Sequence, residues 1–275
     1  MKKLEKPKYE NIENDYMTCI DNSRQKELLE RIKPKILQQV KDYDNICSEK
    51  DKRILIPLSI DKPTKEILYR LYDNNFLAKS SNGRKLYDKL LLSSQVCPYC
   101  KNGIVYTLDH YLPRTIKDGF PELSIISLNL VPCCRDCNSL KHDDIGEQTK
   151  TYLHPYYDDV SKERWLYAKV VYENNGPIIH FFVKSVASYS DELNSRIQYH
   201  FDKLNISRIY SINSGTDLCE IIRYIKDNKM SEGNVKAHLK DLAIINENID
   251  KNSRKTAMYY ALLEDSLFYQ NCIIK

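Results

Sequence analysis

Hydrophobic positions recur at helical spacing through the first third of the chain. Three runs place apolar side chains three or four residues apart, which predicts one helix from Ser23, a second from Pro63 and a third leading to Cys97. Pro34 falls inside the first run and predicts a kink or a restart there. Residues 1–96 are therefore expected to form a helical N-terminal region.

A different pattern begins after residue 164. Trp165 to Tyr172 and Ile178 to Val183 are rich in β-branched and aromatic residues, and Asn174-Asn175-Gly176 between them is a turn signal. The pattern predicts one β-hairpin near 165–184. From Ser190 onward helical spacing returns in four further stretches, the last of them through Leu267, so the rest of the C-terminal region is expected to be helical.

Composition is that of a globular protein. Hydrophobic residues make up 42% and charged residues 29% of the 275 positions. No apolar run approaches the roughly 20 residues needed to cross a bilayer, and the basic N-terminus MKKLEKPKYENIENDY has no apolar core behind it. These features predict a cytoplasmic protein without a membrane partner.

The charge distribution differs along the chain. Residues 1–96 hold 20 Lys or Arg against 15 Asp or Glu, residues 97–154 hold 6 against 7, and residues 155–275 hold 16 against 16. A nucleic-acid binder usually owes much of its affinity to basic residues that face phosphates. We therefore expect the segment 97–154 to approach nucleic acid poorly by itself.

Five of the nine cysteines cluster within residues 97–137. Cys97-Pro98-Tyr99-Cys100 and Cys134-Arg135-Asp136-Cys137 each separate two thiols by two residues, and two such pairs can complete a tetrahedral zinc site. The 33 residues between the pairs exceed the roughly 15 to 20 of common four-cysteine fingers. A functional insertion is therefore expected. Cys133 is assigned no metal role, although a register swap with Cys134 stays open.

The insertion and the residues after it carry polar side chains in a definite order. The segments that carry them are Leu108-Asp109-His110-Tyr111-Leu112-Pro113-Arg114 and Ser127-Leu128-Asn129-Leu130-Val131-Pro132, and Asn138, Lys141 and His142 follow. Over about a fifth of the chain, this arrangement resembles the HNH endonuclease family. The resemblance implies a ββα-metal fold, in which a strand ends in Asp-His and a helix starts at the second cysteine pair.

The residue types suit phosphodiester hydrolysis, which needs a base for water and a cation for the developing charge. His110 can be neutral near pH 7 and is suited to the role of the base. Asp109 offers a hard carboxylate that suits Mg²⁺ or Mn²⁺. Because neighbours on a strand point to opposite sides, the two can serve water and metal together only where the strand twists or ends.

The resemblance also implies roles for residues further along. Asn129 would brace the loop behind the base by hydrogen bonds, and Asn138 would be the second ligand of the catalytic metal. His142 lies four residues after Asn138 and is expected on the same helical face, as an alternative ligand; we favour Asn138 because an oxygen ligand suits Mg²⁺. Arg114 and Lys141 are weaker candidates for phosphate contacts.

Taken together, the sequence predicts a mostly helical α+β protein with three regions: the helical 1–96, an HNH nuclease domain at 97–160, and a hairpin plus helices at 161–275. The predicted activity is DNA hydrolysis with one divalent metal, leaving a 5′-phosphate. The resemblance extends to stand-alone bacterial defence and restriction proteins, which implies a protein partner such as an ATPase, or an oligomeric assembly. The alternative is a non-catalytic four-cysteine zinc ribbon that binds nucleic acid or protein.

Overall fold

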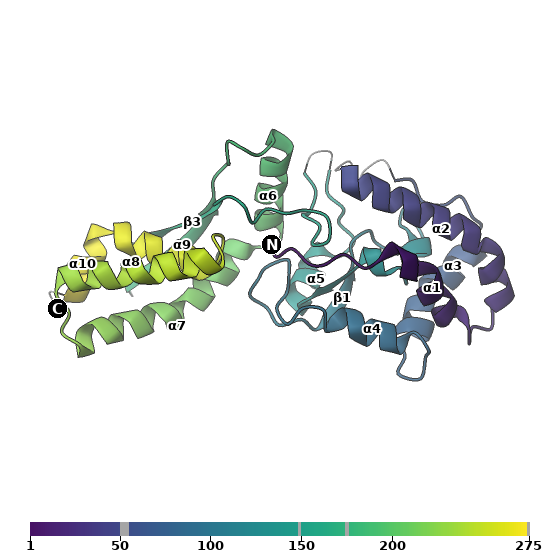
Figure 1. The fold of residues 1–275 in the computed structure, drawn as a ribbon, viewed down its shortest axis with the longest axis horizontal. Coiled ribbons are helices and arrows are strands. Elements are labelled where there is room, and N and C mark those ends of the chain that lie inside the picture. The colour runs from purple at the N-terminus through teal and green to yellow at the C-terminus, as the bar shows by residue number, and fades with distance from the viewer. Residues whose placement is uncertain (50–54, 148–149, 174–175, 274–275) are drawn as a thin grey trace. The chain divides into compact units, whose positions relative to one another are not determined.

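The computed structural model describes residues 1–49, 55–147, 150–173 and 176–273 (Figure 1). It divides into two compact units, Met1–Asp159 and Val160–Lys275. The first unit holds both the N-terminal region 1–96 and nearly all of the segment 97–160. The candidate site is therefore built into the same core as the N-terminal helices.

Within the described residues of the first unit, the α-helices before the candidate site are α1 (Ile12–Ile20), α2 (Lys26–Glu49), α3 (Lys62–Leu71) and α4 (Arg84–Leu91). The helix expected from Ser23 is α2, which runs through Pro34 without a break. Proline has no N–H, so the carbonyl four residues before Pro34 loses its helical hydrogen bond. Pro34 lies on the exposed side of α2, where water can bond to that carbonyl instead. The helix expected from Pro63 is α3, whose N-cap Asp61 accepts a hydrogen bond from the Thr64 N–H at 2.9 Å.

Two short strands and one helix form the centre of the candidate site. Strand β1 (Thr107–His110) pairs antiparallel with β2 (Leu130–Cys133), so that His110 lies opposite Leu130. Helix α5 (Arg135–Lys141) follows β2 directly and packs against β1. Between the strands, the chain makes two short 3-10 turns, η3 (Pro121–Leu123) and η4 (Ser127–Asn129), and both are buried.

The second unit contains the expected hairpin. Strand β3 (Leu166–Glu173) pairs antiparallel with β4 (Gly176–Val183) along their whole length. Asn174 and Asn175 of the predicted turn lie outside the described residues. The helices of this unit are α6 (Asp191–Lys203), α7 (Ile206–Asp227), α8 (Glu232–Ile249), α9 (Arg254–Glu264) and α10 (Ser266–Ile273). Helix α9 packs on β3 and α7 on β4, which buries one face of the two-stranded sheet.

The predicted class, mostly helical α+β, is confirmed. Within the described ranges the helices far outnumber the strands, and the strands form two separate antiparallel pairs. The single C-terminal helix expected through Leu267 is two helices, because the Asp265 carboxylate accepts a hydrogen bond from the Phe268 N–H at 2.7 Å and starts a new one. Among the described residues, no helix combines the length and the apolar character needed to span a bilayer.

Candidate metal centre and active site

Cys97, Cys100, Cys134 and Cys137 form one buried group. Their sulfur atoms all lie within 4.8 Å of one another, and the Sγ atoms of Cys100 and Cys134 are 3.9 Å apart. Ligands of a tetrahedral zinc with bonds of about 2.3 Å would be about 3.8 Å apart. The group could therefore hold zinc. Cys133 lies on β2, where it pairs with Thr107, and it is not part of the group. Of the two neighbouring cysteines, Cys134 is therefore the one that belongs to the group.

Local backbone geometry brings these sulfurs together. Cys134 caps α5, and its Sγ accepts from the Cys137 N–H at 3.4 Å, while the Gly103 N–H donates to Cys100 Sγ at 3.3 Å. A Cβ atom on Gly103 would lie 2.7 Å from Cys134 Cβ and 2.8 Å from Cys134 Sγ. Only glycine fits there. No signal in the sequence marks Gly103, because its partner Cys134 lies 31 residues away along the chain.

The carboxylate of Asp109 lies at the junction of three segments. Asp109 is 3% exposed; its Oδ2 accepts a hydrogen bond from the Tyr99 hydroxyl at 2.8 Å and lies 3.1 Å from Lys141 Nζ. Tyr99 is itself fully buried and stands between the first two cysteines. Burial raises the pKa of Asp109, and the charge of Lys141 opposes that rise. The first cysteine pair, β1 and α5 are thus joined through one side chain.

Lys141 was a weaker candidate for a phosphate contact, which a surface side chain would make, but it lies in the core. Its side chain is fully buried, and Nζ donates to the Asp109 carboxylate and to the His110 carbonyl at 2.9 Å. The ammonium also lies over the rings of Tyr111 and Tyr152, at 5.7 and 5.8 Å from their centroids. A buried carboxylate opposite α5 explains the difference, because it needs a paired cation.

His110 is the last residue of β1 and follows Asp109 directly. Its Nε2 lies 2.7 Å from the Ser124 carbonyl oxygen; a carbonyl can only accept, so Nε2 carries the hydrogen and Nδ1 keeps the lone pair. The ring packs edge-on against Tyr72 with centroids 4.6 Å apart, and it remains partly exposed. Burial lowers the pKa of His110 to about 3. The imidazole is therefore neutral near pH 7.

The side chain of Asn129 holds the loop that follows His110. It is fully buried; Oδ1 accepts from the Leu112 N–H at 2.8 Å and Nδ2 donates to the Leu112 carbonyl at 2.9 Å. The Asn129 carbonyl also accepts from the Tyr111 N–H at 2.8 Å. These bonds fix the backbone immediately after the strand end.

Asn138 and His142 occupy different positions relative to α5. Asn138 is half-buried and lies three residues before Lys141, on the same face of α5 as Lys141. The expectation that His142 shares this face is wrong, because α5 ends at Lys141 and His142 has a φ of 44°. The His142 side chain is exposed and its Nδ1 lies 3.3 Å from Asp143.

Arg114 is held by the helices before the site. Its guanidinium donates to the Tyr69 carbonyl at 2.6 Å and to the Asp73 carboxylate at 3.0 Å, and it lies over the rings of Tyr69 and Tyr72. In this arrangement Arg114 connects the loop after β1 with the C-terminal end of α3.

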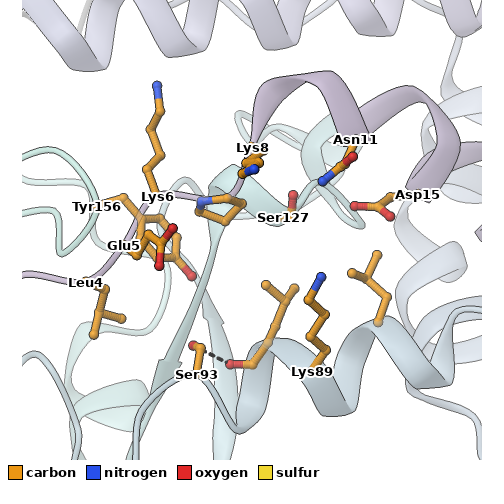
Figure 2. A pocket seen from close by; sticks show the side chains of 13 residues that line it. Leu4, Glu5, Lys6, Lys8, Asn11, Asp15, Lys89, Ser93, Ser127 and Tyr156 are labelled. Atoms are coloured by element: carbon orange, nitrogen blue, oxygen red, sulfur yellow. Dashed lines mark hydrogen bonds between the residues drawn. The ribbon is translucent and has the colours of Figure 1, made fainter.

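A pocket of about 500 Å³ opens in the first unit among the N-terminal segment, α1 and α4 (Figure 2). Lys6, Lys8 and Lys89 line it together with Glu5 and Asp15, so neither charge dominates. The predicted site residues are not among those lining it. The candidate site is therefore defined by the chemistry of its side chains rather than by this pocket.

The fold and site define a class: a mostly helical α+β protein with a buried four-cysteine group that joins a short antiparallel strand pair to the following helix. The chain is 33% identical over 218 residues to protein ea31 of Escherichia phage lambda, and the match covers 77% of this chain and 71% of ea31. The chain belongs to the family of protein ea31. No family model matches it, and no solved structure matches it.

Proposed function

We propose that this chain is an HNH-type endonuclease that hydrolyses DNA phosphodiester bonds. The observation that carries the proposal is the geometry of His110. His110 lies at the end of β1, and its Nε2–H donates to the Ser124 carbonyl. Nδ1 is therefore the nitrogen that can accept a proton, and the ring is partly exposed. A fixed, neutral imidazole with a defined tautomer is what a general base requires.

His110 would take a proton from the attacking water at Nδ1. A pKa of about 3 keeps the imidazole neutral before substrate arrives. An anionic phosphate beside the ring would raise that pKa, because a nearby negative charge favours the protonated form. The base would thus become stronger when DNA is bound. Asn129 would keep the following loop, and so the base, in position.

The hard oxygen donors of Asp109 and Asn138 fit Mg²⁺ or Mn²⁺ by type. When bound, the cation would stabilise charge on the phosphate and on the leaving oxygen. Asp109 would hold the cation from β1 and Asn138 from α5, two elements that pack together. For the four cysteines we propose a structural Zn²⁺, because a closed set of four thiolates leaves no position for substrate.

We further propose that the nuclease serves bacterial anti-phage defence or restriction, in the cytoplasm and with a protein partner such as an ATPase or in an oligomeric assembly. The support is the resemblance of the motif to such proteins. The name of protein ea31, which is encoded by a phage, states no activity.

One observation favours a second candidate, a zinc-ribbon module that only binds. The Asp109 carboxylate is already paired with Lys141 and Tyr99, as a structural carboxylate would be. A catalytic site and a binding module make opposite predictions for DNA cleavage.

Incubating the purified protein with supercoiled plasmid, with and without Mg²⁺ or Mn²⁺, tests the proposal. We expect metal-dependent conversion to nicked or linear DNA with 5′-phosphate ends. Binding of the plasmid without any cleavage, in either metal, would favour the binding module.

A further inference from the structure

We propose that Lys141 is the resident counter-ion of Asp109, and that it competes with a divalent cation for this carboxylate. The inference rests on the proposed function, because that function makes Asp109 a metal ligand. It adds that the metal binds weakly until the ammonium gives up its closest contact with Asp109.

The geometry makes the competition direct. Lys141 Nζ lies 3.1 Å from Asp109 Oδ2 and 3.4 Å from Oδ1, so the ammonium spans both oxygens. Tyr99 donates to Oδ2 from the other side. Lys141 is completely buried and Asp109 nearly so, which means that little water screens charges there.

A magnesium ion would bind a carboxylate oxygen at about 2.0–2.1 Å. With Lys141 in place, that position lies within a few ångströms of the ammonium, and two cations repel strongly in a buried site. The ammonium need not leave the core to relieve this repulsion. The His110 carbonyl and the rings of Tyr111 and Tyr152 already contact it and would keep it in place.

Replacement of the Lys141 ammonium by a metal ion at Asp109 would couple metal binding to substrate binding. A divalent cation added to the Asp109–Lys141 pair, whose charges cancel, makes the site positive, and the single negative charge of a DNA phosphate would offset part of that charge. Metal and phosphate would therefore each raise the affinity for the other, by the same factor. The device limits metal occupancy in the absence of DNA.

Binding of Mn²⁺ alone to the zinc-loaded full chain, followed by electron paramagnetic resonance, tests the inference. In Lys141→Met the competing charge is gone and the aliphatic chain is kept. We expect Mn²⁺ to bind this variant at least about tenfold more tightly than wild type. Lys117→Met removes an exposed lysine of the same unit and is the matched control, which should bind as wild type does. Unchanged or weaker binding by Lys141→Met overturns the inference.

Lys141→Gln, which can still hydrogen-bond to the His110 carbonyl, serves if Lys141→Met does not fold. If both variants are unfolded without metal, Mn²⁺ should restore their thermal unfolding transitions, since it replaces the lost counter-ion; no restoration overturns the inference. Failure of Mn²⁺ to bind wild type and every variant would contradict this inference and the metal-dependent nuclease together. If Mn²⁺ binds more tightly to Lys141→Met as expected but wild type does not cleave plasmid, the result would contradict the nuclease proposal alone.

Discussion

At the scale of single residues, Asp109 connects the parts of the motif. Tyr99 comes from the first cysteine pair, Lys141 from the end of α5, and both meet its buried carboxylate. Any shift of the four-cysteine group is therefore transmitted to Asp109 through the Tyr99 hydroxyl. The four-cysteine group and the proposed catalytic carboxylate are connected through one side chain, that of Tyr99.

Tyr99→Phe should lower the free energy of unfolding without loss of zinc, because the Asp109 carboxylate loses the Tyr99 hydroxyl. The change removes one hydrogen bond to a charged group, which costs about 1.5–3 kcal/mol. Denaturant unfolding and metal analysis measure the two effects. Tyr106→Phe, at a tyrosine that is 58% exposed, is the control and should change the unfolding free energy by less than about 0.5 kcal/mol. Loss of zinc from Tyr99→Phe would show that Tyr99 supports the cysteines rather than Asp109.

Asn129→Ala should lower the free energy of unfolding by about 2–5 kcal/mol, because it leaves the buried N–H and carbonyl of Leu112 without their partners. Plasmid cleavage should fall as the loop after His110 loosens. Asn213→Ala removes an exposed amide bonded to the Ile209 carbonyl on α7 and is the control. A stability loss no larger than that of the control would contradict the bracing role.

Residues that are recognised by their spacing along the chain were predictable from the sequence. Residues whose role depends on a contact with a distant part of the chain were not. The four cysteines follow from their spacing alone. The burial of Lys141 does not, because its cause is a carboxylate 32 positions earlier. The roles of Tyr99 and Gly103 are likewise set by tertiary contacts, with Asp109 and with Cys134.

At the scale of elements, the periodic segments were predictable and their ends were less so. Helix α1 was missed, although Ile12, Tyr16 and Cys19 are buried at helical spacing. It is only 9 residues long, so few positions reveal its period. The break between α9 and α10 depends on one capping carboxylate, that of Asp265.

Gly103→Ala should loosen the four-cysteine group, because the added methyl would contact Cys134 Cβ at 2.7 Å. We expect less than one zinc per chain after mild chelation, while wild type keeps its zinc. Gly215→Ala on α7 meets nothing within 4 Å and is the control; it should stabilise the second unit by about 0.5–1 kcal/mol. Full zinc retention by Gly103→Ala would contradict the geometry of the group.

At the scale of the whole molecule, neither unit is strongly basic. Residues 1–159 hold 26 Lys or Arg against 24 Asp or Glu, and residues 160–275 hold 16 against 14, which gives +2 for each. Buried Lys141 and paired Arg114 offer little of that charge to phosphates. We therefore propose that a partner or an assembly brings this chain to DNA.

The isolated protein should bind duplex DNA with a dissociation constant of about 10⁻⁴ to 10⁻⁶ M at physiological salt, the range of non-specific binding. Its affinity should depend only weakly on salt, because few phosphates are neutralised. Fluorescence anisotropy with a labelled duplex measures both. Submicromolar binding without a partner would contradict the recruitment hypothesis.

The central claim, that His110 is the general base of a nuclease, is tested most directly by plasmid cleavage with His110→Ala in Mg²⁺ or Mn²⁺. We predict a loss of roughly 10²- to 10⁴-fold in rate, with zinc content and circular dichroism unchanged, while His180→Ala on the exposed side of β4 cleaves as wild type does. Cleavage by His110→Ala at close to the wild-type rate would contradict the claim.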